Sequence, residues 1–176
     1  MPRIDTSRPF FPLHIALLTV SDTRTPETDE SGRILASRAT AAGHMIVAQR
    51  IVPDDRAQLA AQLATWIASP EIEIVITTGG TGITGRDVTP EAFDEVLEKP
   101  IPGFGELFRQ LSYQTIGTST IQSRALAGIA NGTYLFALPG STGACRQAWD
   151  EILVFQLDSR HLPCNFAELL PRLRER

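Results

Sequence analysis

The chain has 176 residues, of which 43% are hydrophobic and 20% are charged, and its net charge is −4. This size and composition predict a single globular domain, and the acidic balance argues against a nucleic-acid groove, which needs clustered Lys and Arg. Two cysteines without C-x-x-C spacing and three scattered histidines argue for ordinary thiols and against a zinc site.

The apolar runs have the length of strands, so we expect no membrane span. The first residues lack a signal-peptide pattern, which together with the cysteine usage favours a cytoplasmic protein. We expect an N-terminal extension at 1–12, one α/β domain at 13–170 and a basic C-terminal tail at 171–176.

Strand and helix patterns alternate along the chain, which is typical of a parallel sheet covered by helices. We therefore predict a three-layer α/β/α domain with a mostly parallel sheet and a β-hairpin at its edge. The predicted elements, in chain order, are a strand at 14–20, a helix at 31–42 closed by Gly43, a strand at 44–52, a helix after Pro53 capped by Asp54 or Asp55, a strand at 72–77, a helix at 90–97, a second helix from the break at 100–103 through Leu111, a hairpin over 125–138 and a helix at 144–157.

The hairpin is predicted from two apolar runs separated by Asn131-Gly132, a pair that favours a type I′ turn. Directly after it, the segment 139–143 combines proline and glycine before the last helix. The chain therefore contains a second junction of strand, glycine turn and helix.

The first such junction follows the third strand and is the most informative part of the sequence. Ile74-Val-Ile76 is an unbroken β-branched run, and the glycines after it allow backbone N–H groups to approach a ligand closely. Thr89 is predicted to cap a helix that begins at Pro90. A glycine loop followed by a helix N-terminus predicts an anion site that suits a phosphate.

Ligands of open α/β sheets bind outside the carboxyl ends of the strands, where several loops converge. Four loops should meet at that edge, and each contains carboxylates, glycines or both. They are 21–24, 53–55, 78–87 and 139–143.

Two common nucleotide motifs fit this loop only in part. Gly80 to Gly85 satisfies G-x-G-x-x-G, but it follows the third strand, and Pro90 delays the helix. The same residues supply the glycines of a P-loop, yet Arg86-Asp87 replaces the Lys-Ser/Thr that grips phosphate and magnesium. A carboxylate there repels a triphosphate unless a cation bridges them, so Asp87, with Asp54 as a second candidate ligand, is predicted to hold Mg²⁺ against phosphate oxygens.

Six segments of the chain together form a recognisable set of motifs. They are Leu18-Thr-Val-Ser-Asp22, Thr77-Thr-Gly-Gly-Thr-Gly82, Arg86-Asp-Val-Thr-Pro-Glu-Ala92, Pro102-Gly-Phe-Gly-Glu106, Ser123-Arg124 and Leu138-Pro-Gly140. With these motifs the chain resembles the MoaB/MogA family of molybdenum cofactor biosynthesis proteins, which includes the G domain of gephyrin-like proteins. The resemblance runs in order from about residue 11 to 166.

The resemblance implies a molybdopterin adenylyltransferase, which transfers AMP from Mg-ATP to the molybdopterin phosphate and releases pyrophosphate. It implies that Asp54 and Asp87 are the catalytic and metal-binding residues. It also implies two groups of binding residues: a nucleotide loop of Gly79, Gly80, Thr81 and Gly82 joined by Pro139 and Gly140, and a pterin side lined by Ser21, Asp22, Ser123 and Arg124.

One departure keeps a second function open. The catalytic branch of the family usually carries a proline two positions after the Pro-Gly pair, whereas this chain has Pro139-Gly-Ser-Thr142, as in the MoaB branch. The alternative is a non-catalytic molybdopterin-binding or carrier protein of the same pathway. The family resemblance further implies a homotrimer or homohexamer and, as partners, other enzymes of the pathway.

Overall fold

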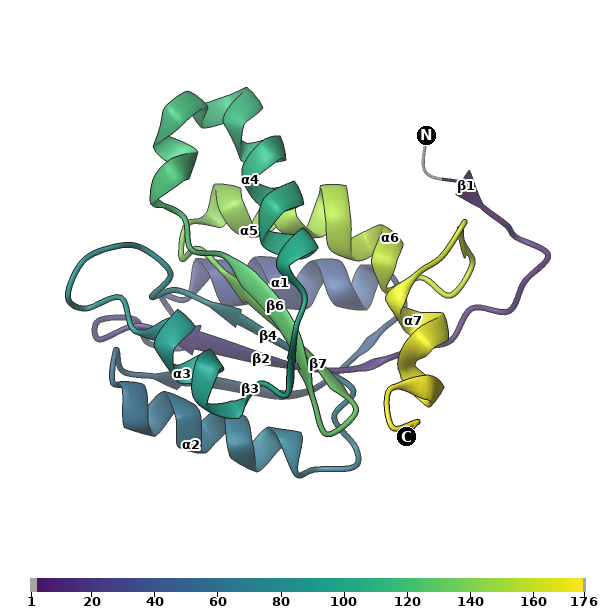
Figure 1. Cartoon of the computed structure of the whole chain (residues 1–176), viewed down its shortest axis with the longest axis horizontal. Helices are drawn as coiled ribbons and strands as arrows, with labels where there is room; N and C mark the ends of the chain where they lie inside the picture. Colours follow the sequence, from purple (N-terminus) through teal and green to yellow (C-terminus); the bar gives the residue numbers. More distant parts are fainter. Residues whose placement is uncertain (1–2, 176) are drawn as a thin grey trace.

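The computed structural model describes residues 3–175 and has the predicted three-layer α/β/α architecture (Figure 1). Residues 1–2 of the expected extension and Arg176 of the expected tail lie outside the described residues. Within 3–175, no helix is both long and apolar enough to cross a bilayer.

The central sheet has six strands in the order β3-β2-β4-β7-β6-β5. Neighbours among the first four strands of this order run parallel, while β6 and β5 pair antiparallel to their neighbours. The strands are β2 (His14–Val20), β3 (Met45–Val52), β4 (Ile74–Thr78), β5 (Lys99–Pro100), β6 (Leu126–Ala130) and β7 (Thr133–Leu138); a separate small pair joins β1 (Arg3–Ile4) to β8 (His161–Leu162).

The hairpin of β6 and β7 is present, with Asn131 and Gly132 at φ values of 47° and 78°, as a type I′ turn requires. Its second strand, however, is an interior strand paired to β4, and the short strand β5 forms the edge beyond β6. Every residue of β7 is buried, which explains its continuous apolar run.

Helices α1 (Glu30–Ala41), α4 (Pro102–Ile116) and α5 (Thr142–Ala148) cover one face of the sheet, and α2 (Arg56–Ile67) and α3 (Thr89–Val96) cover the other (Figure 1). Asp29, Asp55 and Ser141 cap α1, α2 and α5 by accepting backbone N–H bonds. The short elements that complete the chain are η1 (Gly117–Gln122), a π-helical segment (Trp149–Leu153), α6 (Val154–Gln156), α7 (Phe166–Leu169) and η3 (Leu170–Arg172).

Alternate residues of the same strands build two cores. Leu17 and Ile76 point toward α1, α4 and α5, whereas Leu18 and Val75 point toward α2 and α3. The strands β2, β4 and β7 are thus buried on both faces, apart from the half-buried His14, whereas the edge strand β3 is largely exposed. The three buried strands are accessible to a ligand mainly at their ends.

Phe136 of β7 packs against the rings of Phe104 and Phe166 at centroid distances of 5.2 and 5.8 Å and is fully buried. Phe136→Ala should lower the free energy of unfolding by about 3–5 kcal/mol because it leaves a cavity in the core. Phe11, which is 53% exposed, provides the matched control: Phe11→Ala should change stability by only about 0.5 kcal/mol. Denaturant unfolding of both variants measures the difference, and equal losses would contradict this description of the core.

Candidate functional site

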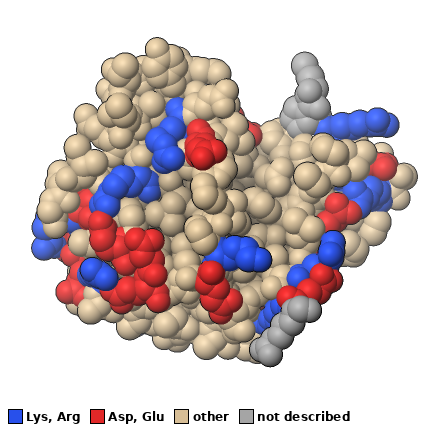
Figure 2. Space-filling model, in the orientation of Figure 1, with Lys and Arg blue, Asp and Glu red and all other residues tan. Residues whose placement is uncertain are grey.

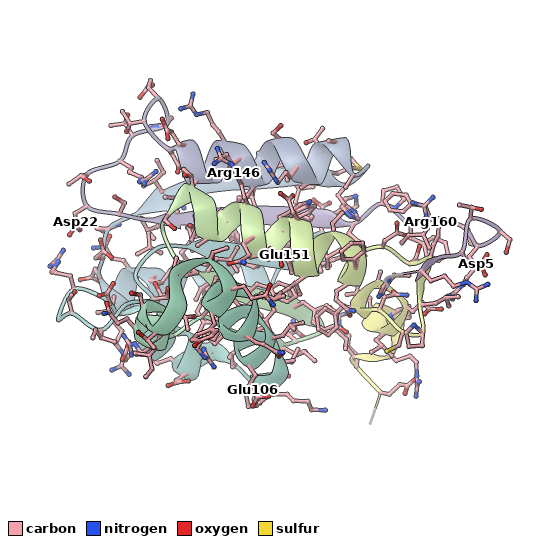
Figure 3. The ribbon with its side chains drawn as sticks, turned by 90° about the horizontal axis from the view of Figure 1, so that it is seen from above. Asp5, Asp22, Glu106, Arg146, Glu151 and Arg160 are labelled. Atoms are coloured by element: carbon pink, nitrogen blue, oxygen red, sulfur yellow. The ribbon has the colours of Figure 1, made fainter. Side chains whose placement is uncertain are left out.

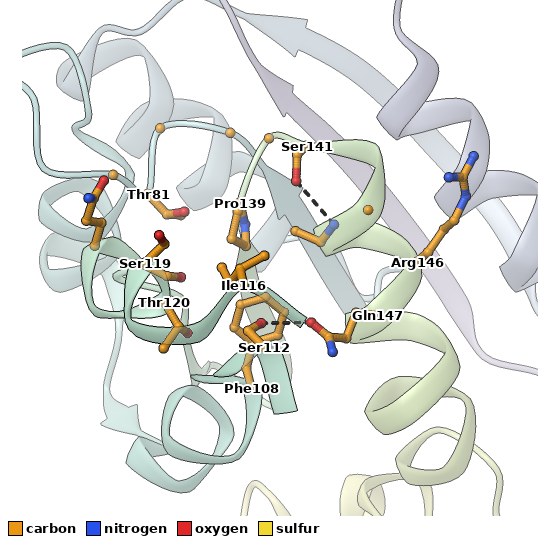
Figure 4. Close-up of a pocket in the computed structure, with 18 of the residues that line it drawn as sticks. Thr81, Phe108, Ser112, Ile116, Ser119, Thr120, Pro139, Ser141, Arg146 and Gln147 are labelled. Carbon is orange, nitrogen blue, oxygen red and sulfur yellow. Dashed lines mark hydrogen bonds between the residues drawn. The ribbon is translucent and has the colours of Figure 1, made fainter. Parts of the chain in front are cut away.

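The four predicted loops do converge at the carboxyl ends of the parallel strands. From β2 the chain crosses to β3 on one side and then to β4 on the other, so the sheet has a topological switch point between β2 and β4. A cavity of about 920 Å³ lies there, bounded by the loops and by α4, η1 and α5 (Figure 4). Asp22 marks this end of the molecule, far from Asp5 and Arg160 at the opposite end (Figure 3).

Close backbone contact holds the loops together. Gly79 has a φ of 105°, and a Cβ there would lie 2.3 Å from the carbonyl oxygen of Val20. A Cβ on Gly140 would lie 3.3 Å from the Cα of Gly79. The ends of β2, β4 and β7 therefore touch main chain to main chain, which requires glycine at position 79.

Thr89 has a different role from the one predicted. The helix α3 begins at Thr89 itself, with Val88 before it and no side-chain cap. The Thr89 hydroxyl instead donates to the carbonyl oxygen of Gly79 at 2.8 Å, and its N–H donates to the carbonyl oxygen of Gly80 at 3.0 Å. The helix start is thereby tied to the glycine loop, which places α3 directly behind it.

Asp87 lines the cavity within a tight turn of the loop. Its Oδ2 accepts hydrogen bonds from the Thr84 N–H and hydroxyl at 2.8 and 2.7 Å. A Cβ on Gly82 would lie 2.7 Å from the same oxygen, so the missing side chain of Gly82 leaves room for the carboxylate. Partial burial acts to raise the pKa of Asp87, but the hydrogen bonds from Thr84 and Gly82 outweigh it and hold the pKa below its ordinary value.

Asp54 lines the same cavity but experiences the opposite effect. Burial and the neighbouring carboxylate of Asp22 raise the pKa of Asp54. Its Oδ1 lies 3.3 Å from where a Cβ on Gly80 would stand. Gly82 thus leaves space for the carboxylate of Asp87, and Gly80 for that of Asp54. The two carboxylates give this part of the cavity a negative charge next to backbone N–H groups of the loop.

The cavity includes ten of the twelve predicted binding and catalytic residues. They are Ser21, Asp54, Gly79, Gly80, Thr81, Gly82, Asp87, Ser123, Pro139 and Gly140. Asp22 and Arg124 are not among the lining residues: Asp22 accepts from the Asp54 N–H and pairs with Arg86, and the Arg124 guanidinium donates to the loop and to Glu91.

A second wall of the cavity was not predicted from sequence. It is formed by α4 and α5, where the Ser112 hydroxyl donates to the Gln147 side chain at 2.8 Å beside Phe108 and Ile116 (Figure 4). The helix α4 extends five residues beyond the predicted end at Leu111, and this extension carries much of the wall. Further lining residues from this region are Thr115, Ser119, Thr120, Gln122, Ala144, Arg146, Asp150 and Glu151.

The donor set suits one kind of cation. Among residues 3–175, no cluster of three or more His, Cys, Asp or Glu side chains could hold a metal alone. Mg²⁺ is usually held by one or two carboxylates and completes its shell with water and substrate phosphates. Asp54 and Asp87 beside a glycine loop fit that arrangement.

Comparison with known proteins identifies the family of the chain. Residues 16–159 match the family described as "Probable molybdopterin binding domain". The match covers most of the chain and defines its class, a molybdopterin-binding domain. The chain belongs to the MoaB/MogA family of molybdenum cofactor biosynthesis proteins, as the sequence motifs predicted.

Relatives named "Molybdenum cofactor biosynthesis protein B" are similar over most of their length. The protein of Escherichia coli is 51% identical over 160 residues, which are 91% of this chain and 94% of the relative. The protein of Bacillus subtilis is 44% identical over 142 residues, covering 80% and 84% of the two chains.

Two solved structures have the same fold. A crystal structure of a molybdenum cofactor biosynthesis protein B has a TM-score of 0.86 at 36% identity and covers 96% of this chain and 100% of its own. The tungsten cofactor synthesizing protein MoaB from Pyrococcus furiosus has a TM-score of 0.76 at 32% identity and covers 93% and 98%.

The two cavity carboxyls should titrate in a definite order. Since the pKa of Asp54 is raised and that of Asp87 is lowered, Asp54 should take up a proton first as the pH falls. Divalent cation affinity should then begin to weaken near the pKa of Asp54, because proton and metal compete for it. Carboxyl carbon NMR, with Asp54→Asn to assign the resonance, measures this order. Protonation of Asp87 before Asp54 would contradict it.

Proposed function

We propose that the protein is a molybdopterin adenylyltransferase, which transfers AMP from Mg-ATP to the terminal phosphate of molybdopterin and releases pyrophosphate. The observation that carries the proposal is the pair of carboxylates, Asp54 and Asp87, at a glycine loop that opens on a cavity of about 920 Å³. That volume lies near the upper end for small-molecule sites, as two substrates held together require.

In this reaction an oxygen of the pterin phosphate attacks the α-phosphorus of ATP and forms the new P–O bond. The bond from the α-phosphorus to the oxygen that bridges it to the β-phosphorus breaks, and pyrophosphate leaves with that electron pair. Since the nucleophile is already ionised, the main task of the protein is to align two anions and offset their repulsion. Bound Mg²⁺ supplies positive charge to the phosphate oxygens.

The residues of the chain divide this task between them. The N–H groups of Gly80 and Thr81 donate to no backbone carbonyl in the part of the chain that the structure describes, which leaves them available to phosphate oxygens. Asp54 and Asp87 would hold the metal, and Ser21 and Ser123 offer hydroxyls on the cavity wall. The mixed wall of Phe108, Ile116 and the Ser112–Gln147 pair suits a flat heterocycle with a polar edge.

The competing proposal is binding without catalysis, as in a molybdopterin carrier. It is favoured by the segment Pro139-Gly-Ser-Thr142, which lacks the proline of the catalytic branch. Here Ser141 caps α5 through a 3.2 Å bond from the Ala144 N–H. The two proposals differ in whether purified protein makes adenylated molybdopterin.

Wild-type protein should form adenylated molybdopterin from ATP and fresh pterin, and product formation should depend on Mg²⁺. Asp87→Asn should lower the rate about tenfold or more, which corresponds to roughly 1.4 kcal/mol of transition-state stabilisation, while the fold stays intact. The matched control is Asp94→Asn, which removes the same charge from an exposed position on α3 outside the cavity lining. Tight pterin binding without product would favour the carrier, and an unchanged Asp87→Asn rate would remove Asp87 from the mechanism.

We also propose that the chain forms a homotrimer or homohexamer. Acidic and basic side chains gather over α2 and α3, whereas the surface over the C-terminal end of α4 and over η1 is largely uncharged (Figure 2). On α4 and η1, Tyr113, Ile116 and Ile121 are 58%, 55% and 81% exposed, and exposed apolar side chains of this size favour association.

Light scattering should therefore give a mass three or six times that of the 19.2 kDa chain. Ile121→Glu should reduce that mass, because it places a charge on the apolar surface. A wild-type monomer at micromolar concentration would contradict the oligomer proposal.

A further inference from the structure

Arg124 binds the glycine loop at both ends of its turn. The Arg124 N–H donates to the carbonyl oxygen of Thr81 at 2.8 Å, which joins the segment before β6 to the loop after β4. In the side chain, Nε donates to the carbonyl oxygen of Gly82 at 2.6 Å, and Nη2 donates to that of Asp87 at 2.8 Å. One planar guanidinium therefore bridges the first and last residues of the 82–87 turn.

Glu91 in the first turn of α3 holds the other side of the guanidinium. Its carboxylate accepts from Nη1, and it accepts from Nη2 at 3.3 Å. All three guanidinium nitrogens of Arg124 thus donate to protein acceptors, and Arg124 does not line the cavity. The guanidinium is therefore already bonded within the protein, unlike that of an arginine whose N–H groups are available to a phosphate.

The shape of the 82–87 turn determines where the Asp87 carboxylate lies. That carboxylate is bonded within the turn, to the N–H and hydroxyl of Thr84, and occupies the space beside Gly82. Arg124 donates to main-chain oxygens of the turn and makes no hydrogen bond to the Asp87 carboxylate, and Asp87 lines the cavity. If the 82–87 turn changed its conformation, the Asp87 side chain would still carry a carboxylate, but this carboxylate would no longer have a fixed position.

We propose that Arg124, held by Glu91, is a positioning residue that fixes Asp87 for divalent cation binding and does not contact either substrate. This inference rests on the proposed function, since it assigns Asp87 to the metal. It predicts that metal affinity, measured without turnover, depends on an ion pair that lies outside the cavity. Loss of such supporting contacts typically weakens metal binding by about 10–100-fold.

The test is a titration of Mn²⁺, as a spectroscopic substitute for Mg²⁺, followed by electron paramagnetic resonance with the full chain. Arg124→Gln should weaken Mn²⁺ binding about tenfold, and Glu91→Gln should weaken it in the same direction. Arg124→Lys keeps the charge but lacks the fork that reaches two carbonyls, so it should restore little of the affinity. Arg160→Gln is the matched control, because Arg160 forms its ion pair with Asp158 at the end of the molecule opposite Asp22 (Figure 3).

Adenylation assays separate positioning from substrate contact. In Arg124→Gln the Mg²⁺ concentration for half-maximal rate should rise about tenfold, and saturating Mg²⁺ should restore most of the rate with an unchanged KM for the pterin. Unfolding midpoints of the variants establish that they are folded, and Glu91→Gln serves as the second variant if Arg124→Gln is unstable.

Wild-type Mn²⁺ affinity in both Arg124→Gln and Glu91→Gln would overturn the inference. A raised KM for the pterin at saturating Mg²⁺ would overturn it as well, and would make Arg124 a phosphate ligand. If the wild-type protein binds Mn²⁺ without forming product, adenylation fails as the function, while the effect of Arg124 on metal affinity still decides its positioning role.

Discussion

The site depends on one contact, the approach of the main chain at Gly79 to the ends of two neighbouring strands. Because the Val20 carbonyl oxygen stands where a side chain of residue 79 would begin, β2 and β4 meet at their tips without any side chain between them. Gly140 brings the end of β7 to the same place. Main-chain atoms of Gly79 and Gly140 therefore line the cavity, and the charged side chains line it beside them.

Two acids that line the cavity, Asp54 and Asp87, have pKa values that their immediate surroundings shift in opposite directions. The hydrogen bonds of its own turn keep Asp87 ionised, whereas burial and the nearby Asp22 make ionised Asp54 less favourable. A cation at the site would relieve the second effect, since it offsets the repulsion between carboxylates. The site thus combines one carboxylate whose ionised form is favoured by its own turn with one whose ionised form is disfavoured by its surroundings.

Local patterns in the sequence indicated much of this arrangement. Buried β-branched runs predicted the parallel strands, Asn131-Gly132 predicted the hairpin, and Asp55 was one of two predicted caps of α2. Such signals are readable because each depends on residues within one turn or strand. Arg124 shows the limit: its motif indicated a phosphate ligand, but its three nitrogens are occupied by Gly82, Asp87 and Glu91, which come from two other segments.

The sequence by itself determined the α/β class, the family and the four loops that form the ligand edge, because glycine spacing and strand periodicity are local properties. Only the tertiary structure decided that β7 lies inside the sheet, that Thr89 ties α3 to the glycine loop, and that Ser112 and Gln147 are hydrogen-bonded to each other in the cavity wall. These features arise from contacts between segments far apart in the chain, where packing selects one partner among many that the local sequence allows.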